Sequence, residues 1–338
     1  MRFDVSERGW QILLTALAFA GLGLLPSVIP SFYASLLAFT FTYVIAAVGV
    51  NLLTGYTGLV TVGHGGFFAI GAYATALMAK YLGTSVGPGL IVGAVLSGLI
   101  GFALGIICLR LGGAFLAIAT LGFALAVGAI LNNWPIFEGR EGIQLGKNAF
   151  LGLQLRDVGF YYVGLVTMAL VMLVSWSIVR SAVGRAFLAM RDSERAAEAM
   201  GINLRLYKTV SFAVSAAMMG VGGALFAHHN RYVSAETFGS AWLSVDFLTA
   251  VVVGGQGSLF GSAIGAAFVV LVPYYLGTMQ DFAYILNGVA LILVLRFAPD
   301  GVAGVLGRAL RSMVGPVHRK TPTTAEPAPV GRGSQWHR

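Results

Sequence analysis

The chain has 338 residues, of which 57% are hydrophobic and only 10% are charged. Because a soluble domain carries about 25% charged residues, this composition excludes an ordinary soluble protein and indicates a polytopic helical membrane protein. The formal net charge is +8, but the basic residues gather in loops and at the C-terminus, which indicates membrane topology and contact with anionic lipid rather than nucleic acid as a partner.

The first half of the chain predicts six membrane spans. Residues 9–79 contain no Asp, Glu, Lys or Arg, and at about 20 residues a span they hold about three helices, the first of them retained rather than cleaved. The six predicted spans are Trp10–Ile29, Phe32–Leu53, Val62–Ala79, Leu90–Leu109, Ala114–Asn133 and Phe160–Val179. The polar loop 134–158 has balanced charges, as suits an external loop.

A glycine-rich segment, Asn51–Tyr73, falls within the predicted membrane region and contains six glycines. Irregular backbone at membrane depth is tolerated only inside protein or beside a water-filled cavity, so we expect this segment to line a substrate pathway. The candidate pathway residues are Asn51, Thr54, Gly55, Tyr56, Gly58, Thr61, Gly63, His64 and Gly66. The alternative is tight packing of small helix faces. For His64 we favour a hydrogen-bonded structural role, because no carboxylate stands near it in the sequence.

The segment 180–208 is strongly polar between two apolar spans. Its nine charges are Arg180, Arg185, Arg191, Arg195, Arg205 and Lys208 against Asp192, Glu194 and Glu198. One charge at the bilayer centre costs about 2.5–3.5 kcal/mol on insertion scales, so the segment lies outside the bilayer, and its arginines place it in the cytoplasm.

This cytoplasmic segment also carries signals for a short amphipathic helix. Asp192 is predicted to be its N-cap, Glu194 lies in the first turn, and Gly201 is placed as the C′ glycine. The segment is either a solvated loop that obeys the positive-inside rule or a docking element for a soluble partner.

The second half predicts four further spans. These are Val210–His228, the short Leu243–Gly254, Ser258–Leu276 and Phe282–Leu295. The prediction is therefore an all-α transmembrane bundle of about ten spans, or eight or nine if the short segment is re-entrant. Residues 1–307 form the transmembrane domain, both termini are cytoplasmic, and residues 308–338 form a basic, Pro/Thr-rich tail that is predicted to be disordered.

The sequence lacks the motifs of an enzyme or a self-powered carrier. It has no ATP-binding motif, no HExxH and no cluster of metal ligands, and the glycine-rich Val251–Ala267 lacks the lysine of a phosphate-binding loop. The candidate intramembrane acids are Asp246 and Asp281, both placed near an interface, whereas an ion-coupled carrier usually needs buried ionisable groups. We expect a non-enzymatic transport pathway, without cofactor or metal, that is energised by a separate soluble motor.

Several stretches together resemble the LivM-type permease subunit of branched-chain (hydrophobic) amino acid ABC importers. They are NLLTGYTGLVTVGHGGFFAIGAYATAL, LAIATLGFA, GRAFLAMRDSERAAEAMGINLRLYK, VVVGGQGSLFGSAIGAA and FAPDGVAGVL, which extend from about Asn51 to Leu306. The resemblance implies an ABC transporter permease in the bacterial inner membrane. The residues it implies for contact with the ATPase are Arg191, Asp192, Glu194, Ala197 and Gly201.

The resemblance also implies partners: a second, LivH-type permease subunit, two ATP-binding subunits and an external solute-binding protein. One departure from the family lies in the external loop, at Ile136–Ile143. It leaves urea or short amides open as alternative substrates. A secondary carrier or channel and an integral-membrane enzyme are the alternatives from other classes.

Overall fold

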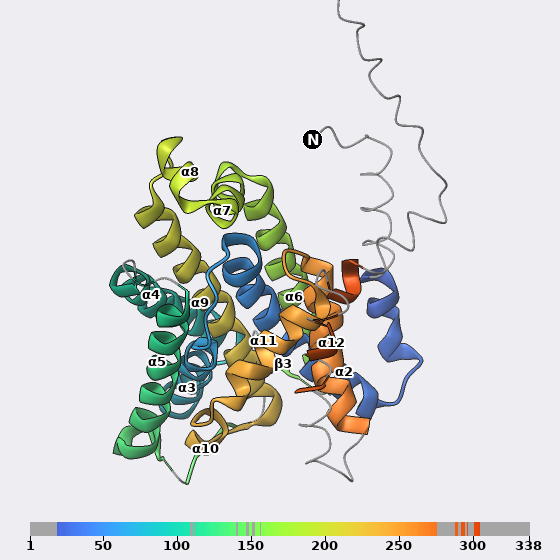
Figure 1. The fold of residues 1–338 in the computed structure, drawn as a ribbon. Helices are drawn as coiled ribbons and strands as arrows, with labels where there is room; N and C mark the ends of the chain where they lie inside the picture. Colours follow the sequence, from blue (N-terminus) through green and yellow to red (C-terminus); the bar gives the residue numbers. More distant parts are fainter. Residues whose placement is uncertain are drawn as a thin grey trace, which may run out of the picture.

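The computed structural model describes residues 19–108, 111, 113–139, 141–146, 149–150, 153–155, 157–275, 288–289, 292–294, 296 and 301–304. Six long helices form a bundle (Figure 1): α2 (Ser31–Asn51), α3 (His64–Leu82), α4 (Val86–Ile107), α5 (Ala114–Asn133), α6 (Asp157–Arg180) and α9 (Leu204–Asn230). The predicted span Ala114–Asn133 coincides with α5, and the spans predicted for α2, α3, α4, α6 and α9 differ from these helices by up to six residues at either end.

Shorter elements connect and close the bundle. Among the described residues they are η1 (Leu25–Ser27), the π-helix η2 (Leu52–Tyr56), η4 (Pro135–Phe137), α7 (Ala182–Asp192), α8 (Glu194–Ala199), α10 (Ala235–Phe238), α11 (Trp242–Gly254) and α12 (Leu259–Tyr275). The structure also contains two short antiparallel strand pairs, which the all-α prediction did not include. Strand β1 (Ile143–Gln144) pairs with β4 (Tyr232–Val233), and β2 (Ala149–Phe150) pairs with β3 (Leu153–Gln154).

Helix α9 is the centre of the bundle and packs against α2, α3 and α4. Close approach depends on small residues: a Cβ at Gly220 of α9 would lie 2.2 Å from the carbonyl oxygen of Gly93 in α4, and a Cβ at Gly71 of α3 would lie 2.2 Å from that of Gly220. Helices α2 and α9 are largely buried, whereas most residues of the apolar stretches of α4, α5 and α6 are not buried. These outer faces suit lipid or a second membrane subunit.

Five helical segments of the described chain are long and apolar enough to cross a membrane: Ser31–Tyr56, Val86–Ile107, Ala114–Asn133, Asp157–Arg180 and Leu204–Asn230. Helix α11 has 13 residues, about 20 Å, which is shorter than a hydrocarbon core of about 30 Å. It packs against α12 as a hairpin. The predicted span Trp10–Ile29 falls partly, and Phe282–Leu295 largely, outside the described residues, so the number of ten spans stays a prediction.

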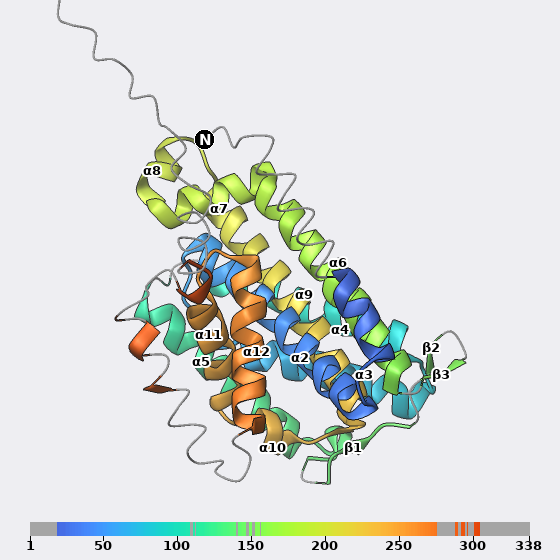
Figure 2. The same ribbon diagram turned by 90° about the vertical axis from the view of Figure 1, so that its right-hand side faces the viewer.

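The two ends of the bundle differ in character. Figures 1 and 2 show α7 and α8 at one end, with α10 and the β1–β4 pair at the other. The glycine-rich connection between α2 and α3 lies on the α7–α8 end, because η2 contacts α7. The segment predicted to line a pathway therefore adjoins the segment predicted to dock a motor.

Candidate coupling site and pathway segment

The polar segment after α6 folds as two helices joined at Ser193. The hydroxyl of Ser181 caps α7 by accepting from the amide of Val183 at 3.1 Å, and Ser193 caps α8 by accepting from the amide of Ala196 at 3.3 Å. The prediction that Asp192 is the N-cap was wrong by one residue. The backbone leaves helical geometry at Ser193 (φ −164°), so Asp192 remains the last residue of α7.

The end of α8 follows the sequence prediction. Gly201 has φ +83°, its amide donates to the carbonyl of Glu198 at 2.9 Å, and the next amide, of Ile202, donates to Ala197 at 3.0 Å. This is a Schellman motif, in which a left-handed C′ residue satisfies the last helical carbonyls. The prediction of Gly201 as the C′ glycine is confirmed, and it fixes where the chain turns toward α9.

Ion pairing and apolar packing hold α8 against the bundle. Glu194, in the first turn of α8, pairs with Lys208 of α9 at 2.7 Å. On the inner side, Ala197 is 3% exposed and lies in a cluster with Leu52, Phe187 and Met190. The apolar side of the helix pair thus packs directly onto Leu52, the first residue of η2.

The outer side of the helix pair stays exposed. Of the residues carried over for ATPase contact, Arg191, Asp192, Glu194 and Gly201 are exposed, whereas Ala197 faces inward. Met200, beside Gly201, is 84% exposed. Single exposed apolar side chains are common on protein surfaces, so Met200 alone does not define a binding surface.

Helix α2 ends in a buried π-helical turn. All five residues of η2 are buried, and π-turns inside helices occur frequently at functional sites. Gly55 lies where no side chain would fit, because a Cβ there would come 1.8 Å from Oδ1 of Asn51 and 2.5 Å from the amide nitrogen of Gly257. The hydroxyl of Thr57 donates to the carbonyl of Leu53 and helps to close the turn.

Asn51 joins this turn to a distant part of the chain. Its Nδ2 donates to the carbonyl of Ser258 at 2.8 Å and to the hydroxyl of Ser262 at 2.7 Å, while its Oδ1 accepts from the amide of Gly257 at 2.8 Å. The side chain is fully buried. Sequence reasoning assigned Asn51 to the pathway and missed these contacts, because no local pattern signals a partner about 207 residues away.

His64 has both ring nitrogens engaged and is 2% exposed. Nδ1 lies 2.7 Å from the hydroxyl of Thr61, and Nε2 lies 2.8 Å from the hydroxyl of Ser215. The Ser215 hydroxyl donates its only proton to the carbonyl of Gly49, so it accepts from Nε2–H, and Nδ1 accepts from Thr61. This arrangement of a neutral imidazole supports the structural role expected for His64.

The nine candidate pathway residues lie between residues 51 and 66 of the chain. Eight are buried and Gly58 is exposed. Some glycines serve close packing: a Cβ at Gly63 would lie 2.3 Å from the carbonyl oxygen of Thr120 in α5, and one at Gly66 would lie 3.1 Å from Cα of Ala124. Their pathway role stays a prediction.

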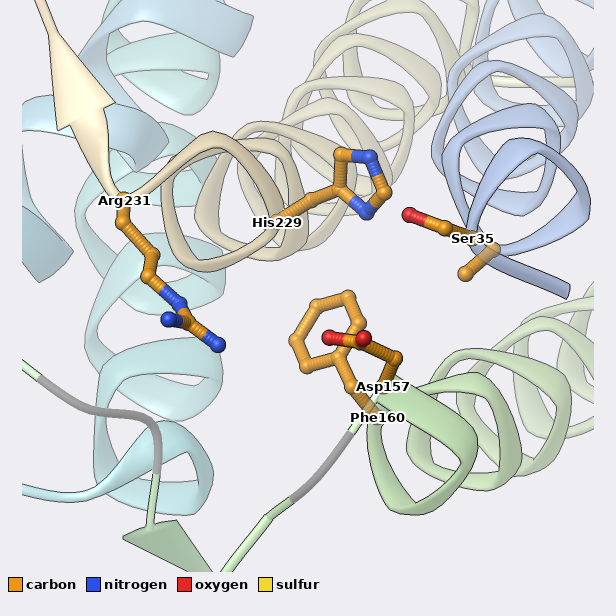
Figure 3. A pocket seen from close by; sticks show the side chains of 6 residues that line it. Ser35, Asp157, Phe160, His229 and Arg231 are labelled. Atoms are coloured by element: carbon orange, nitrogen blue, oxygen red, sulfur yellow. The ribbon is translucent and has the colours of Figure 1, made fainter. Parts of the chain in front are cut away.

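A small polar pocket lies at the other end of the bundle, between the starts of α2 and α6 and the end of α9 (Figure 3). Its lining residues are Ser35, Ala38, Asp157, Phe160, His229 and Arg231. The cavity volume is about 30 Å³, enough for one or two waters but not for an amino acid. The described residues contain no group of three or more His, Cys, Asp or Glu side chains that could hold a metal ion.

The long apolar helices, together with the polar α7–α8 pair at one end of the bundle, define the class of the protein: a multi-pass helical membrane protein. The family model described as "Branched-chain amino acid transport system / permease component" matches residues 32–295. The chain belongs to this permease family. The resemblance seen in the sequence is thereby confirmed, and the family is one of transport proteins rather than of enzymes.

Individual relatives agree. The chain is 33% identical over 289 residues to the "High-affinity branched-chain amino acid transport system permease protein LivM" of Escherichia coli (strain K12), covering 78% of this chain and 68% of that protein. It is 28% identical over 265 residues to a probable LivM of Methanocaldococcus jannaschii, covering 71% of this chain and 76% of that protein.

A relative with another named role is the "Autoinducer 2 import system permease protein LsrC" of Escherichia coli (strain K12 / DH10B), 26% identical over 230 residues, 64% of each protein. No solved structure matches the chain.

Proposed function

We propose that this chain is the membrane-spanning permease subunit of an ATP-binding-cassette importer that carries branched-chain or other hydrophobic amino acids across the bacterial inner membrane. Family membership and the similarity to LivM of Escherichia coli support the substrate class. The α7–α8 pair is the observation that carries the mechanism. It is capped at both ends, fixed to η2 on its inner side and exposed on its outer side.

In this proposal the exposed side of α7–α8 receives the ATPase. Arg191, Asp192 and Glu194 supply charge at the junction of the two helices, and Gly201 ends α8 so that the tip keeps its shape. Ala197 contributes from inside, by anchoring α8 to Leu52. Closure of the ATPases on ATP binding would then displace the helix pair and alternate access to the pathway.

The proposed complex contains a second, LivH-type permease subunit, two ATP-binding subunits and an external solute-binding protein, with lipid around the outer helices. The excess of Arg and Lys in residues 180–208 supports a cytoplasmic position for α7–α8. It follows that residues 134–158 face outward, and that the N- and C-termini are cytoplasmic.

The proposed pathway segment consists of eight buried residues and the exposed Gly58: Asn51, Thr54, Gly55, Tyr56, Gly58, Thr61, Gly63, His64 and Gly66. Its η2 part contacts α7. In the described conformation the buried residues are closed in by packing, so they would reach substrate when the helices separate. His64 supports this region through Thr61 and Ser215.

A different small solute is the second candidate for the substrate. LsrC is named as a permease of an autoinducer 2 import system, so the relatives of this chain include proteins named for a solute other than an amino acid. The unusual external segment Ile136–Ile143 adjoins the side where a binding protein would deliver substrate. Urea or a short amide would fit the same architecture.

Reconstitution of the complete complex in proteoliposomes tests the proposal. Binding protein loaded with labelled leucine, valine, urea or acetamide is placed outside, with ATP inside. ATP-dependent uptake of leucine and valine is expected, and vesicles without ATP are the control. Uptake of urea or acetamide alone would select the second candidate. Uptake that does not depend on ATP would indicate a channel or secondary carrier and refute the importer.

A further inference from the structure

One side chain of the α7–α8 pair reaches into the bundle. Nη1 of Arg191 donates to the carbonyl of Gly55 in η2 at 2.7 Å. A Cβ at Gly58 would lie 3.3 Å from Cγ of Arg191, and a Cβ at Gly257 would lie 2.9 Å from its Nη1. Arg191 therefore stands where η2, the exposed Gly58 and the α11–α12 connection meet.

The carbonyl that Arg191 binds is one that the helix leaves open. Gly55 is next to last in η2, and the last four carbonyls of a helix have no partner within it. A buried carbonyl without a partner is costly, and a hydrogen bond from a charged donor is stronger than one between neutral groups. The contact thus stabilises the π-helical end of α2 only while α7 holds its place.

At the same turn, the side chain of Asn51 connects η2 to a distant part of the chain. Its three hydrogen bonds end on Gly257, Ser258 and Ser262, in the α11–α12 connection and the first turn of α12. Gly55 packs closely against both partners of this link, because a Cβ there would clash with the side chain of Asn51 and with the backbone of Gly257. The chain of contacts runs from α7 through η2 to the α11–α12 hairpin without a gap.

We propose that Arg191 and Asn51 are positioning residues that transmit movement of the α7–α8 pair to the α11–α12 hairpin, with η2 as the deformable element between them. The role in transport rests on the proposed function; the linkage itself does not. A π-turn contains one more residue than an α-turn, so its conversion shifts the register of the helix end. Displacement of Arg191 would release Gly55, loosen η2 and free the hairpin held by Asn51.

Hydrogen exchange in the purified permease tests the linkage without any transport. Arg191→Ala is expected to raise exchange of the amides of residues 257–262 roughly fivefold, although none of them belongs to α7, because loss of one hydrogen bond has about that effect. Asn51→Ala is expected to raise exchange in α7 reciprocally. Arg185→Ala removes an exposed arginine from the same helix and is the matched control, expected to leave residues 257–262 unchanged.

Two outcomes overturn the linkage. In one, faster exchange in Arg191→Ala stays within α7 and α8. In the other, Arg185→Ala produces the same change at residues 257–262. If the buried Asn51→Ala does not fold, Arg191→Ala against Arg185→Ala still decides, because Arg191 is largely exposed.

Reconstituted complexes then test the role in transport. In Arg191→Ala, uptake per ATP hydrolysed is expected to fall about fivefold, and Arg185→Ala is expected to behave as wild type. A wild-type complex without amino acid uptake would refute the proposed function, while the exchange result would still decide the linkage. Normal uptake per ATP in Arg191→Ala would refute its role in transmission.

Discussion

Replacement of Gly201 by valine tests whether the docking surface depends on the backbone turn that ends α8. Gly201 has φ +83°, and a Cβ built there meets no atom within 4 Å. Within the chain, the substitution therefore has a conformational cost rather than a steric one. A left-handed conformation costs an ordinary L-residue about 1–2 kcal/mol, and a β-branched residue resists it most.

The free-energy cost of Gly201→Val to α8 follows from the two ways in which the turn can respond. If the substituted valine stays left-handed, α8 bears about 1–2 kcal/mol of strain. If it does not, the hydrogen bonds from the amides of residue 201 and Ile202 are lost, at about 0.5–1.5 kcal/mol each. Either route raises the open population of this six-residue helix by about tenfold, since 1.4 kcal/mol is a factor of ten.

The assay combines hydrogen exchange with transport. In Gly201→Val, the amide of Ile202 is expected to exchange about tenfold faster, and reconstituted complexes are expected to hydrolyse ATP with reduced uptake per ATP. Gly201→Asn is the matched control, because asparagine tolerates the left-handed region. Wild-type exchange and uptake in Gly201→Val would refute the reasoning. Equal damage from valine and asparagine would show that the defect is a side-chain clash with a partner, not backbone strain.

Three further predictions concern α8, His64 and the orientation in the membrane. Glu194→Lys breaks the ion pair to α9 and is expected to lower uptake per ATP several-fold. The control Glu198→Lys makes an equal charge change at an exposed position of α8 and is expected to have a smaller effect. Equal losses in the two variants would show that net charge alone, not the ion pair, causes the defect. His64→Gln keeps hydrogen bonding without titration near neutral pH, so uptake and its pH profile should stay near wild type; a large loss in a folded complex would contradict the structural role. In a cysteine-free background, an impermeant thiol reagent should label Glu141→Cys but not Met200→Cys in intact cells, and the reverse pattern would overturn the orientation.

The sequence predicted the helices well because apolar length is a local property. Ala114–Asn133 is bounded by a glycine and by a polar segment, and the structure begins and ends α5 at the same residues. Gly201 was predictable for the same reason, since a glycine after a short polar helix is a common C′ residue. The N-cap was missed because Asp192 and Ser193 are both good caps and only the backbone angles decide between them.

The linkage at η2 was not predictable, because its partners are far apart in the chain. Arg191 and Gly55 are separated by 136 residues, and Asn51 and Ser258 by 207. Composition predicted that Arg191 lies outside the bilayer, and its carbon stem allows both that position and a hydrogen bond within the protein. Counting charges cannot reveal which arginine of a basic loop turns inward.

The position of the glycine-rich segment unites two hypotheses that the sequence kept separate. Small and polar residues near the end of α2 were expected to line a pathway, and charged residues after α6 were expected to dock a motor. Leu52 packs into the α7–α8 cluster, and Gly55 accepts a hydrogen bond from Arg191, so the two segments form one unit. Gly58 and Gly257 leave room for the arginine, and Gly55 is the one residue of η2 without a side chain. We expect a segment built in this way to change shape when its neighbour moves, as the proposed coupling to separate ATPase subunits requires.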